Sequence, residues 1–149
     1  MADLRDIYQE LILEHAKSPR NCRAIAAPTQ KADGYNPLCG DRCTVYVAMH
    51  GEVIEDIAFQ GSGCAISRAS ASMMTQSVKG KTVGEAENLF RSFHRMVTGQ
   101  DSNGNHSEIG KLAVFAGVAE FPARVKCATL AWHTLQAALH GDREPVTSE

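Results

Sequence analysis

The stretch RCTVYVAMHGEVIEDIAFQ, residues 42–60, contains the strongest local pattern in the sequence. Its first half alternates apolar and polar side chains, and its second half resumes a strand-like pattern after His50-Gly51. Alternation with a period of two is typical of a half-buried strand, and a short break containing glycine is typical of the turn between two antiparallel strands. We therefore predict a β-hairpin with strands at residues 42–49 and 52–60.

Five segments around the hairpin have apolar residues at helical spacing, start signals or stop signals of helices. They are residues 3–16, 65–80, 82–98, 108–118 and 124–140. Thr82 followed by Glu85 is a capping-box pattern at the start of the third segment, and Gly141 follows the last one as a stop signal. Residues 20–40 have an irregular pattern with room for one short edge strand.

Together these elements predict an α+β fold, in which about five helices pack on a small antiparallel sheet. The chain has 149 residues, of which 44% are apolar. That amount of apolar sequence is enough to enclose one core. We therefore expect a single domain over residues 1–149.

The charge and the first residues argue against several classes of function. The formal net charge is -2, and lysine and arginine form no basic stripe with interleaved aromatic residues, so we expect no nucleic-acid partner. The start, MADLRDIYQE, is polar and unlike a secretory signal, and no apolar run is long enough to span a bilayer. We expect a cytoplasmic protein that does not bind membranes. The sequence also lacks the GxxxxGK[ST] and GxGxxG motifs of nucleotide chemistry.

Five cysteines in a chain without an export signal argue against a disulfide framework. Packing, metal binding and nucleophilic chemistry remain as their possible roles. Cys43 continues the apolar phase of its strand, so we interpret it as a buried structural thiol. Cys22 lies in the polar loop PRNCR with no acid or histidine at ligand spacing, and we assign it no chemical role. The histidines lie on helical patterns or in turns and form no metal-binding or catalytic motif.

Two of the other cysteines lie where a thiolate is favoured. Cys64 follows Gly61-Ser62-Gly63 and opens a helix, where unpaired backbone N–H groups stabilise an anion and lower a thiol pKa. Cys127 follows Arg124 and Lys126, two cations that also favour a thiolate. Simpler interpretations remain open, because a glycine-rich turn often carries an incidental cysteine and the helical phase of Cys127 matches the core stripe.

The hexapeptide NPLCGD, residues 36–41, places Cys39 and Asp41 on either side of a glycine. Cys39, Cys64 and Cys127 each fall at the beginning of a predicted element, so the three thiols meet if those ends share one edge of the sheet. Asp41 then completes a four-ligand shell that suits Zn²⁺, which accepts thiolate and carboxylate ligands in tetrahedral geometry. The spacing does not show that the four side chains converge, and turn chemistry also explains NPLCGD.

Three motifs taken in order carry a strong resemblance to a known family. They are YNPLCGD (35–41), GSGCAISRASAS (61–72) and RVKCATLAWHTL (124–135). The chain resembles the IscU-like family of iron-sulfur assembly proteins, and more closely its SufU branch. The likeness covers nearly the whole chain, and residues 82–98 look like the insertion that distinguishes SufU from scaffold-type IscU. The resemblance implies a three-stranded antiparallel sheet with helices and a metal site at one edge.

Residue by residue, the resemblance implies that the metal ligands are Cys39, Asp41, Cys64 and Cys127. Scaffold-type IscU proteins carry a histidine immediately before the third cysteine and an LPPVK chaperone motif. Here Lys126 precedes Cys127 and FPARVKC replaces the motif. This departure favours the SufU role, which is that of a zinc-dependent sulfur acceptor for a SufS-type cysteine desulfurase in iron-sulfur cluster assembly. Downstream iron-sulfur assembly proteins are then further partners.

The resemblance also implies roles within the ligand set. In SufU-like proteins the desulfurase supplies a histidine to zinc and frees the cysteine at the Cys39 position to take the persulfide sulfur. Cys39 is thus the implied acceptor, and the other three ligands retain the metal. Arg124 matches a SufU motif position, where it either holds the thiolates or orients the acceptor. A surface cation at a helix N-terminus is the alternative for Arg124.

Three functions remain open from the sequence. The first is the sulfurtransferase partner of a desulfurase. The second is an iron-sulfur scaffold that carries a transient cluster. The third is a purely structural zinc module, in which all four ligands support folding equally.

Overall fold

The computed structural model describes residues 4–37, 40–100, 109–141 and 146–147. Along the chain its elements are α1 (Leu4–Lys17), β1 (Gln30–Asn36), β2 (Asp41–His50), β3 (Val53–Ser62), α2 (Ala65–Val78), α3 (Val83–Val97), η1 (Gly110–Glu120), α4 (Pro122–His140) and β4 (Val146–Thr147). No helix among the described residues is long and apolar enough to cross a membrane.

The sheet has the strand order β3-β2-β1-β4. The predicted hairpin is β2 and β3, which pair antiparallel with Val45 opposite Phe59 and with a register shift at Ala48/Met49. The sequence pattern allows one short strand within residues 20–40. This strand is β1, which pairs antiparallel with β2. The two residues of β4, which the sequence did not predict, add a short parallel pairing to β1. The expected α+β fold, with three main antiparallel strands and five helices, is confirmed.

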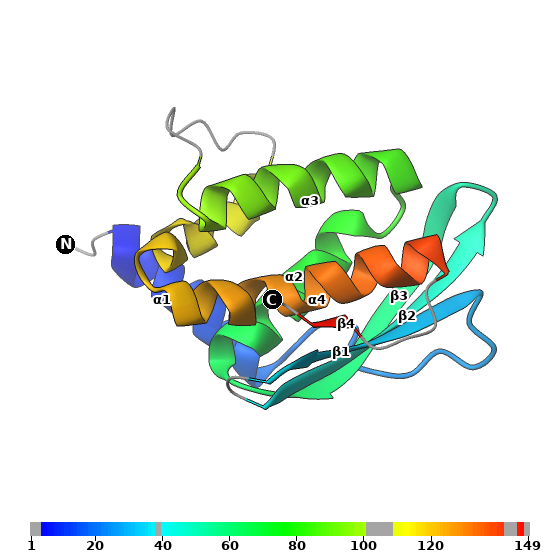
Figure 1. The fold of residues 1–149 in the computed structure, drawn as a ribbon, viewed down its shortest axis with the longest axis horizontal. Coiled ribbons are helices and arrows are strands. Elements are labelled where there is room, and N and C mark those ends of the chain that lie inside the picture. Colours follow the sequence, from blue (N-terminus) through cyan, green and yellow to red (C-terminus); the bar gives the residue numbers. More distant parts are fainter. Residues whose placement is uncertain (1–3, 38–39, 101–108, 142–145, 148–149) are drawn as a thin grey trace.

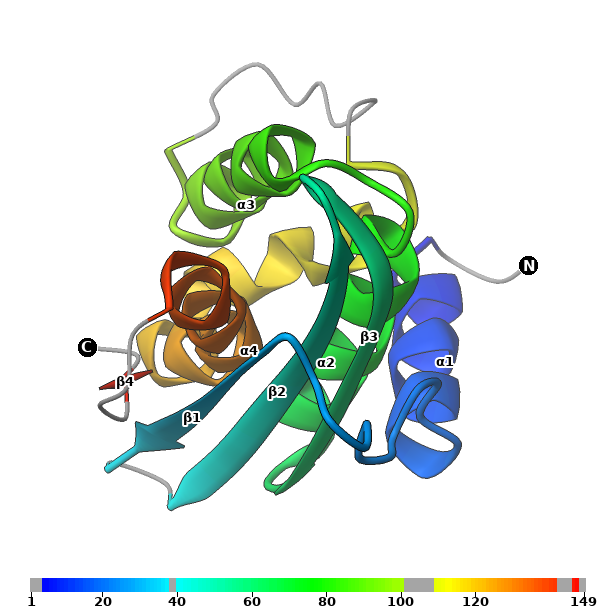
Figure 2. The ribbon, with the colours of Figure 1, turned by 90° about the vertical axis from the view of Figure 1, so that its right-hand side faces the viewer.

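The helices cover one face of the sheet. Helices α2 and α4 contact the strands directly, and α3 and η1 lie beyond them (Figure 1). Helix α1 lies against α2, on the side away from α4 (Figure 2). In this arrangement the ends of β1 and β3 and the starts of β2 and α2 gather at one edge of the sheet.

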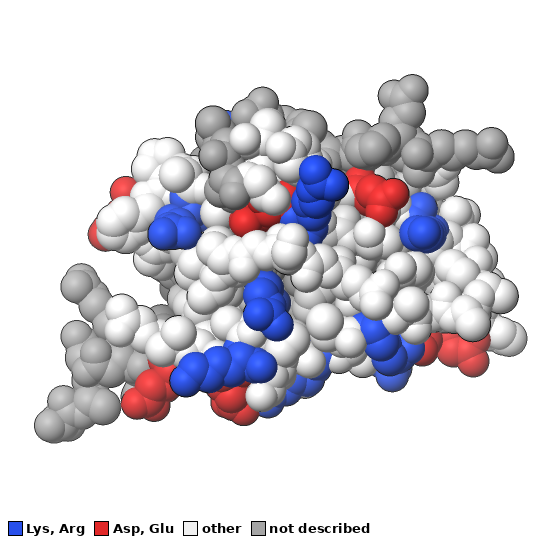
Figure 3. All heavy atoms as spheres, turned by 90° about the horizontal axis from the view of Figure 1, so that it is seen from below, with Lys and Arg blue, Asp and Glu red and all other residues white. Residues whose placement is uncertain are grey.

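The other face of the sheet carries polar and charged side chains. Lys31 lies over the Tyr46 ring at 5.5 Å from its centroid, and Arg42 lies over the Tyr35 ring at 5.2 Å. Figure 3 shows lysine and arginine side chains spread over this side of the molecule, with acidic side chains close to several of them. The strands therefore alternate between a buried face under the helices and an exposed face.

The connection from α1 to β1 fastens α1 to α2. The Ser72 hydroxyl accepts the Arg20 backbone N–H at 2.8 Å and contacts Nδ1 of the buried His15 at 2.7 Å. Asn21 Nδ2 donates to Thr75 Oγ1 at 3.0 Å. These contacts hold α1 at a fixed place beside α2.

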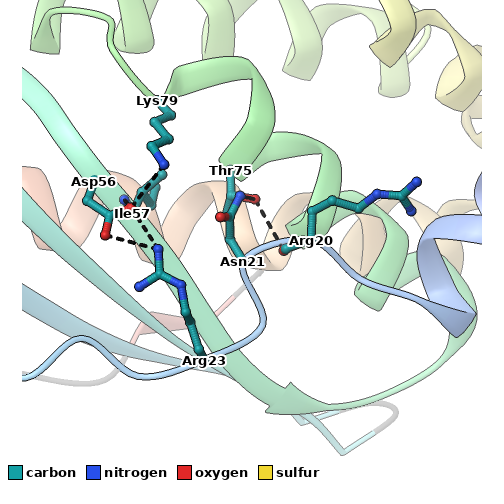
Figure 4. Close-up of polar contacts among 7 residues, drawn as sticks. All are labelled: Arg20, Asn21, Arg23, Asp56, Ile57, Thr75 and Lys79. Carbon is teal, nitrogen blue, oxygen red and sulfur yellow. Dashed lines mark hydrogen bonds and ion pairs between the residues drawn. The ribbon is translucent and has the colours of Figure 1, made fainter.

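A few residues further along, an exposed ion-pair cluster continues this connection. Arg23 binds Asp56 at 2.8 Å, and Lys79 reaches the same carboxylate at 3.5 Å (Figure 4). The cluster links the connection both to β3 and to the end of α2. Exposed ion pairs contribute little stability each, so the cluster mainly defines the path of the chain.

Two helices differ from their predicted form. Residues 110–120 form a 3₁₀ helix, GKLAVFAGVAE, whose glycines and β-branched valines are weak α-helix formers. The predicted start at Ser107 and Glu108 lies outside the described residues. Helix α4 begins at Pro122 instead of residue 124, because proline is tolerated at the first helical position. Cys127 therefore lies in the second turn of α4 and not at its beginning.

An aromatic cluster joins α3, η1 and α4 in the core. The Trp132 ring is fully buried and stacks on Phe93 at 4.7 Å between centroids and on Phe90 at 6.0 Å. Phe115 of η1 meets Phe93 edge-on at 5.8 Å. The predicted capping box is present at the start of α3, where the Thr82 and Glu85 side chains each accept a backbone N–H from the other residue.

Ser70 links α2 and α4, the helices that carry Cys64 at the start of α2 and Cys127 within α4. Its buried hydroxyl donates to the Ala128 carbonyl at 2.5 Å and accepts the Trp132 indole N–H at 3.2 Å. Both partners belong to α4, whereas Ser70 lies on α2. The register between α2 and α4 is thus fixed by hydrogen bonds as well as by packing.

We expect Ser70→Ala to lower the free energy of unfolding by about 1–3 kcal/mol, because it leaves the Trp132 N–H and the Ala128 carbonyl buried without this partner. In a Trp132→Phe background the same substitution should cost less, since the indole N–H that would lose its partner is already absent. Urea unfolding of the four proteins gives the coupling energy. A cost of Ser70→Ala that is identical in both backgrounds would contradict the link.

Candidate metal centre

Asp41, Cys64 and Cys127 converge at the edge of the sheet. One ligand atom from each, a carboxylate oxygen and two sulfurs, lies within 4.8 Å of the others. Asp41 is the first residue of β2, Cys64 is the N-cap of α2, and Cys127 lies in the second turn of α4. Asp41 and Cys127 are buried and Cys64 is half-buried. Three segments that are remote in sequence therefore present metal-ligating atoms to one point.

The Asp41 carboxylate is held against the turn that precedes α2. Its Oδ1 accepts the Cys64 backbone N–H at 3.2 Å, and its Oδ2 lies 3.8 Å from Cys64 Sγ. Asp41 itself is fixed because it pairs with Asn36 across the β1–β2 ladder. This hydrogen bond holds the carboxylate of β2 and the sulfur at the start of α2 beside each other.

Gly63 is a functional residue that the sequence analysis did not single out. A Cβ atom at this position would lie 2.7 Å from Asp41 Oδ1 and 2.8 Å from its Cγ, too close for any real contact. Only glycine allows the carboxylate to reach the Cys64 N–H. The GSG run before Cys64 was the available signal, but the run does not say which side chain fills the space.

The start of α2 stabilises Cys64 as a thiolate. The pKa of Cys64 is lowered to about 6, chiefly because it accepts a hydrogen bond from the Cys127 thiol, with further help from the backbone N–H groups of Ser67 and Ile66. Burial and the Asp41 charge act in the opposite direction. The expected effect of a helix N-terminus on this thiol is therefore present, together with a stronger one from Cys127.

Arg124 lies next to both sulfurs. Its pKa is raised, chiefly because the negative charge of Cys64 and then of Cys127 attracts its own charge, and also because both sulfurs accept its hydrogen bonds. The side chain is otherwise exposed. The Arg124 cation thus borders the cluster on its solvent side.

The structure does not test Cys39, which lies outside the described residues. Next to it, Gly40 has φ of +76° and donates its N–H to the Asn36 carbonyl at 2.8 Å, which closes the turn between β1 and β2. Cys43 is buried in the core, and burial raises its pKa to about 12. Cys22 is exposed and, like Cys43, is not part of the cluster of described ligand atoms.

The donor set fits zinc. Two sulfurs and a carboxylate oxygen match the ligands that Zn²⁺ prefers, and bonds of about 2.0–2.3 Å place tetrahedral ligand atoms about 3.5–3.8 Å apart. Because the three atoms already lie within 4.8 Å of one another, small side-chain movements bring them to that spacing. The concentration of negative charge also favours a cation at this point.

Comparisons with known proteins match most of the chain. A family model described as "NifU-like N terminal domain" matches residues 7–128. The zinc-dependent sulfurtransferase SufU of Bacillus subtilis (strain 168) is 40% identical over 135 residues, which cover 91% of this chain and 90% of that protein. The iron-sulfur cluster assembly scaffold protein IscU of Streptococcus pyogenes serotype M1 is 41% identical over 139 residues, which cover 93% of this chain and 86% of that protein.

Solved structures show the same similarity. A candidate iron-sulfur cluster assembly scaffold protein for the SUF system from Fervidobacterium islandicum AW-1 is 34% identical, with a TM-score of 0.84 over 92% of this chain and 99% of that one. The N-terminal part of a NifU-like protein from Brucella abortus is 27% identical, with a TM-score of 0.83 over 93% of this chain and 96% of that one. The likeness in fold therefore extends over nearly the whole chain.

We expect Gly63→Ala to weaken zinc binding by about 10–100-fold, the usual effect of disturbing a residue that orients a metal ligand. The added methyl group pushes the Asp41 carboxylate away from Cys64. Gly84→Ala is the matched control, because a Cβ there meets only Thr82 Oγ1, at 4.0 Å. Competition with a chromophoric chelator measures the affinities.

The same experiment can show that the effect acts through Asp41. If it does, Asp41→Ala and the double variant Asp41→Ala/Gly63→Ala should bind zinc equally weakly, since the group displaced by the methyl is already absent. Unchanged affinity of a folded Gly63→Ala protein would contradict the assignment. An additive loss in the double variant would place the effect elsewhere.

Proposed function

The chain belongs to the NifU-like N-terminal domain family of iron-sulfur cluster assembly proteins, and on this premise we propose that it is a zinc-dependent sulfur acceptor. The observation that carries the proposal is the meeting of Asp41, Cys64 and Cys127 beside Arg124. The 40% identity to a zinc-dependent sulfurtransferase over 91% of the chain supports it.

We assign zinc to Asp41, Cys64 and Cys127, with Cys39 as the fourth ligand and as the acceptor of sulfur. Cys39 is separated from Asp41 by one glycine and falls in sequence between the end of β1 and the start of β2. A segment that connects two strands is less constrained than a helix such as α4, which holds Cys127. Zinc, when bound, keeps its cysteine ligands deprotonated at neutral pH.

The transfer step needs a donor persulfide and no outside oxidant. The Cys39 thiolate attacks the terminal sulfur of the donor persulfide. A new S–S bond forms between Cys39 Sγ and that sulfur, while the S–S bond of the donor breaks. The bonding electron pair leaves with the donor cysteine, which becomes a thiolate. Sulfur and charge are conserved, and Cys39 now carries the persulfide.

Arg124 has a defined part in this proposal. Its guanidinium already hydrogen-bonds the sulfurs of Cys64 and Cys127, and it lies on the solvent side of the site. A cation there compensates the negative charge of the donor persulfide as it approaches a cluster of anionic ligands. We therefore propose that Arg124 stabilises the negative charge of the incoming persulfide and orients its sulfur.

The donor in this proposal is a SufS-type cysteine desulfurase, which forms a persulfide from L-cysteine and releases alanine. The downstream partners are the iron-sulfur assembly proteins that take sulfur from Cys39. The family and the zinc-type ligand set support these partners. In this proposal the exposed cysteine Cys22 takes no part in sulfur transfer.

We expect Cys39→Ala to abolish the stimulation of a SufS-type desulfurase, because no acceptor thiol remains, while the protein stays folded. Cys22→Ala is the matched control, since it removes an exposed cysteine that lies away from the described ligand cluster. Alanine release and mass spectrometry of trapped persulfide provide the two measurements. Full stimulation by Cys39→Ala would rule out Cys39 as the acceptor. Its unfolding would favour a structural zinc module.

A scaffold function is the second candidate, and the 41% identity to the Streptococcus pyogenes scaffold protein favours it. Anaerobic reconstitution with iron and sulfide separates the two functions. A scaffold should give a stable cluster that transfers to an apo-acceptor, seen by its visible absorbance. The sulfur acceptor proposed here should retain zinc and form no transferable cluster.

A further inference from the structure

A groove of about 730 Å³ lies between α1, the start of α2, η1 and the η1–α4 junction. Its apolar lining includes Ile12 of α1, Ile66 of α2 and Val114 and Val118 of η1. Phe121, at the junction, stands at its rim with 57% of its surface exposed. This is the most exposed of the large apolar side chains in the described part of the chain. Apolar surface of this kind next to a site is typical of a binding surface.

Two residues belong both to the groove and to the surroundings of the Cys64 sulfur. The Ile66 backbone N–H donates a hydrogen bond to the Cys64 sulfur, and the Arg124 guanidinium hydrogen-bonds the sulfurs of Cys64 and Cys127. Both residues also line the groove. Whatever fills the groove therefore touches two residues that hold a proposed metal ligand.

Both walls of the groove are held in place by contacts with the rest of the fold. Helix α1 forms one wall and is fixed against α2 by the contacts of His15 and Arg20 with Ser72. The opposite wall is η1, whose Leu112 and Phe115 are anchored in the core. A preformed apolar groove costs less to occupy than one that must first be assembled.

We propose that this groove receives an apolar segment of the sulfur-donating cysteine desulfurase, an inference that rests on the function proposed above. The donor must bring its persulfide to the metal site, and the groove shares Ile66 and Arg124 with that site. The charged lining residues, Glu120 and Arg124, are of opposite sign, so the apolar contacts carry the binding. A second copy of this chain in the groove would cover the site against the donor.

Gly117 allows a direct test, because it lines the groove and has free space around it. A Cβ atom at Gly117 meets nothing within 4 Å, and its φ is not positive. A leucine there fills part of the groove without strain in the backbone. Gly84 is the matched control, since it is an exposed glycine on α3 with space for a side chain and does not line the groove.

The experiment measures alanine release by a SufS-type desulfurase with L-cysteine, as the concentration of this protein is varied. We expect Gly117→Leu to raise the half-saturating concentration by about tenfold or more, with an unchanged maximal rate, because it blocks docking and leaves the acceptor intact. Phe121→Ala, which shortens an exposed side chain, should act in the same direction. Gly84→Leu should match the unmodified protein. Zinc content and circular dichroism confirm that each variant is folded.

The outcomes separate this inference from the function on which it rests. If the unmodified protein does not stimulate the desulfurase, the proposed function fails. If it stimulates and both Gly117→Leu and Phe121→Ala keep the unmodified half-saturating concentration, the groove assignment alone is overturned. The groove assignment is also overturned if sedimentation shows a dimer that Gly117→Leu dissociates. That result would assign the groove to a second copy.

Discussion

The packing of α2 against α4 determines where Cys64 and Cys127, the two described cysteines of the candidate metal centre, lie. Ser70 bonds across this interface to the Ala128 carbonyl and the Trp132 indole, one residue and five residues beyond Cys127. Cys64 and Cys127 are thereby set at a fixed separation on two rigid helices. Asp41 is added by the sheet, and Gly63 leaves the space in which its carboxylate lies. The metal centre is thus a product of tertiary packing, and no single segment could form it alone.

The cost of this arrangement is a concentration of negative charge in a partly buried place. A carboxylate and a low-pKa thiolate lie side by side, and the Asp41 charge works against ionisation of Cys64. Backbone N–H groups at the start of α2 and the Arg124 guanidinium offset part of this repulsion. A divalent cation offsets much more, so metal binding and the stability of this edge of the sheet are coupled. The same charge balance makes the site selective for a ligand of opposite sign.

Much of the fold follows from local patterns in the sequence. Alternation identified β2 and β3 to within two residues, and the Thr82–Glu85 pair marked the start of α3. The strand β1 was harder to predict from sequence, because QKADGYN has little apolar character. Its strand conformation depends on pairing with β2. For residues 110–120 the apolar content was clear, but the choice between an α-helix and a 3₁₀ helix depends on how the segment packs.

The candidate site was predictable in its residue types and not in its assembly. Cys64 and Asp41 stood out because of their positions at the ends of elements, and Arg124 because of the motif around it. Their meeting, the hydrogen bond from Cys127 to Cys64 and the role of Gly63 depend on distances between segments more than 20 residues apart in sequence. The groove beside Arg124 was not predicted, since its lining comes from three separate parts of the chain.

The burial of Cys43 has a consequence for sulfur transfer under the proposed function. A persulfide can pass its outer sulfur to any thiolate within reach, and Cys43 is only two residues from Asp41 in sequence. Because burial raises its pKa to about 12, only about one Cys43 side chain in 10⁵ is ionised at pH 7. Its side chain also points into the core, on the opposite face of the strand from solvent. Under the proposed function, the fold thus keeps the Cys43 thiol from competing for sulfur delivered to this part of the sheet.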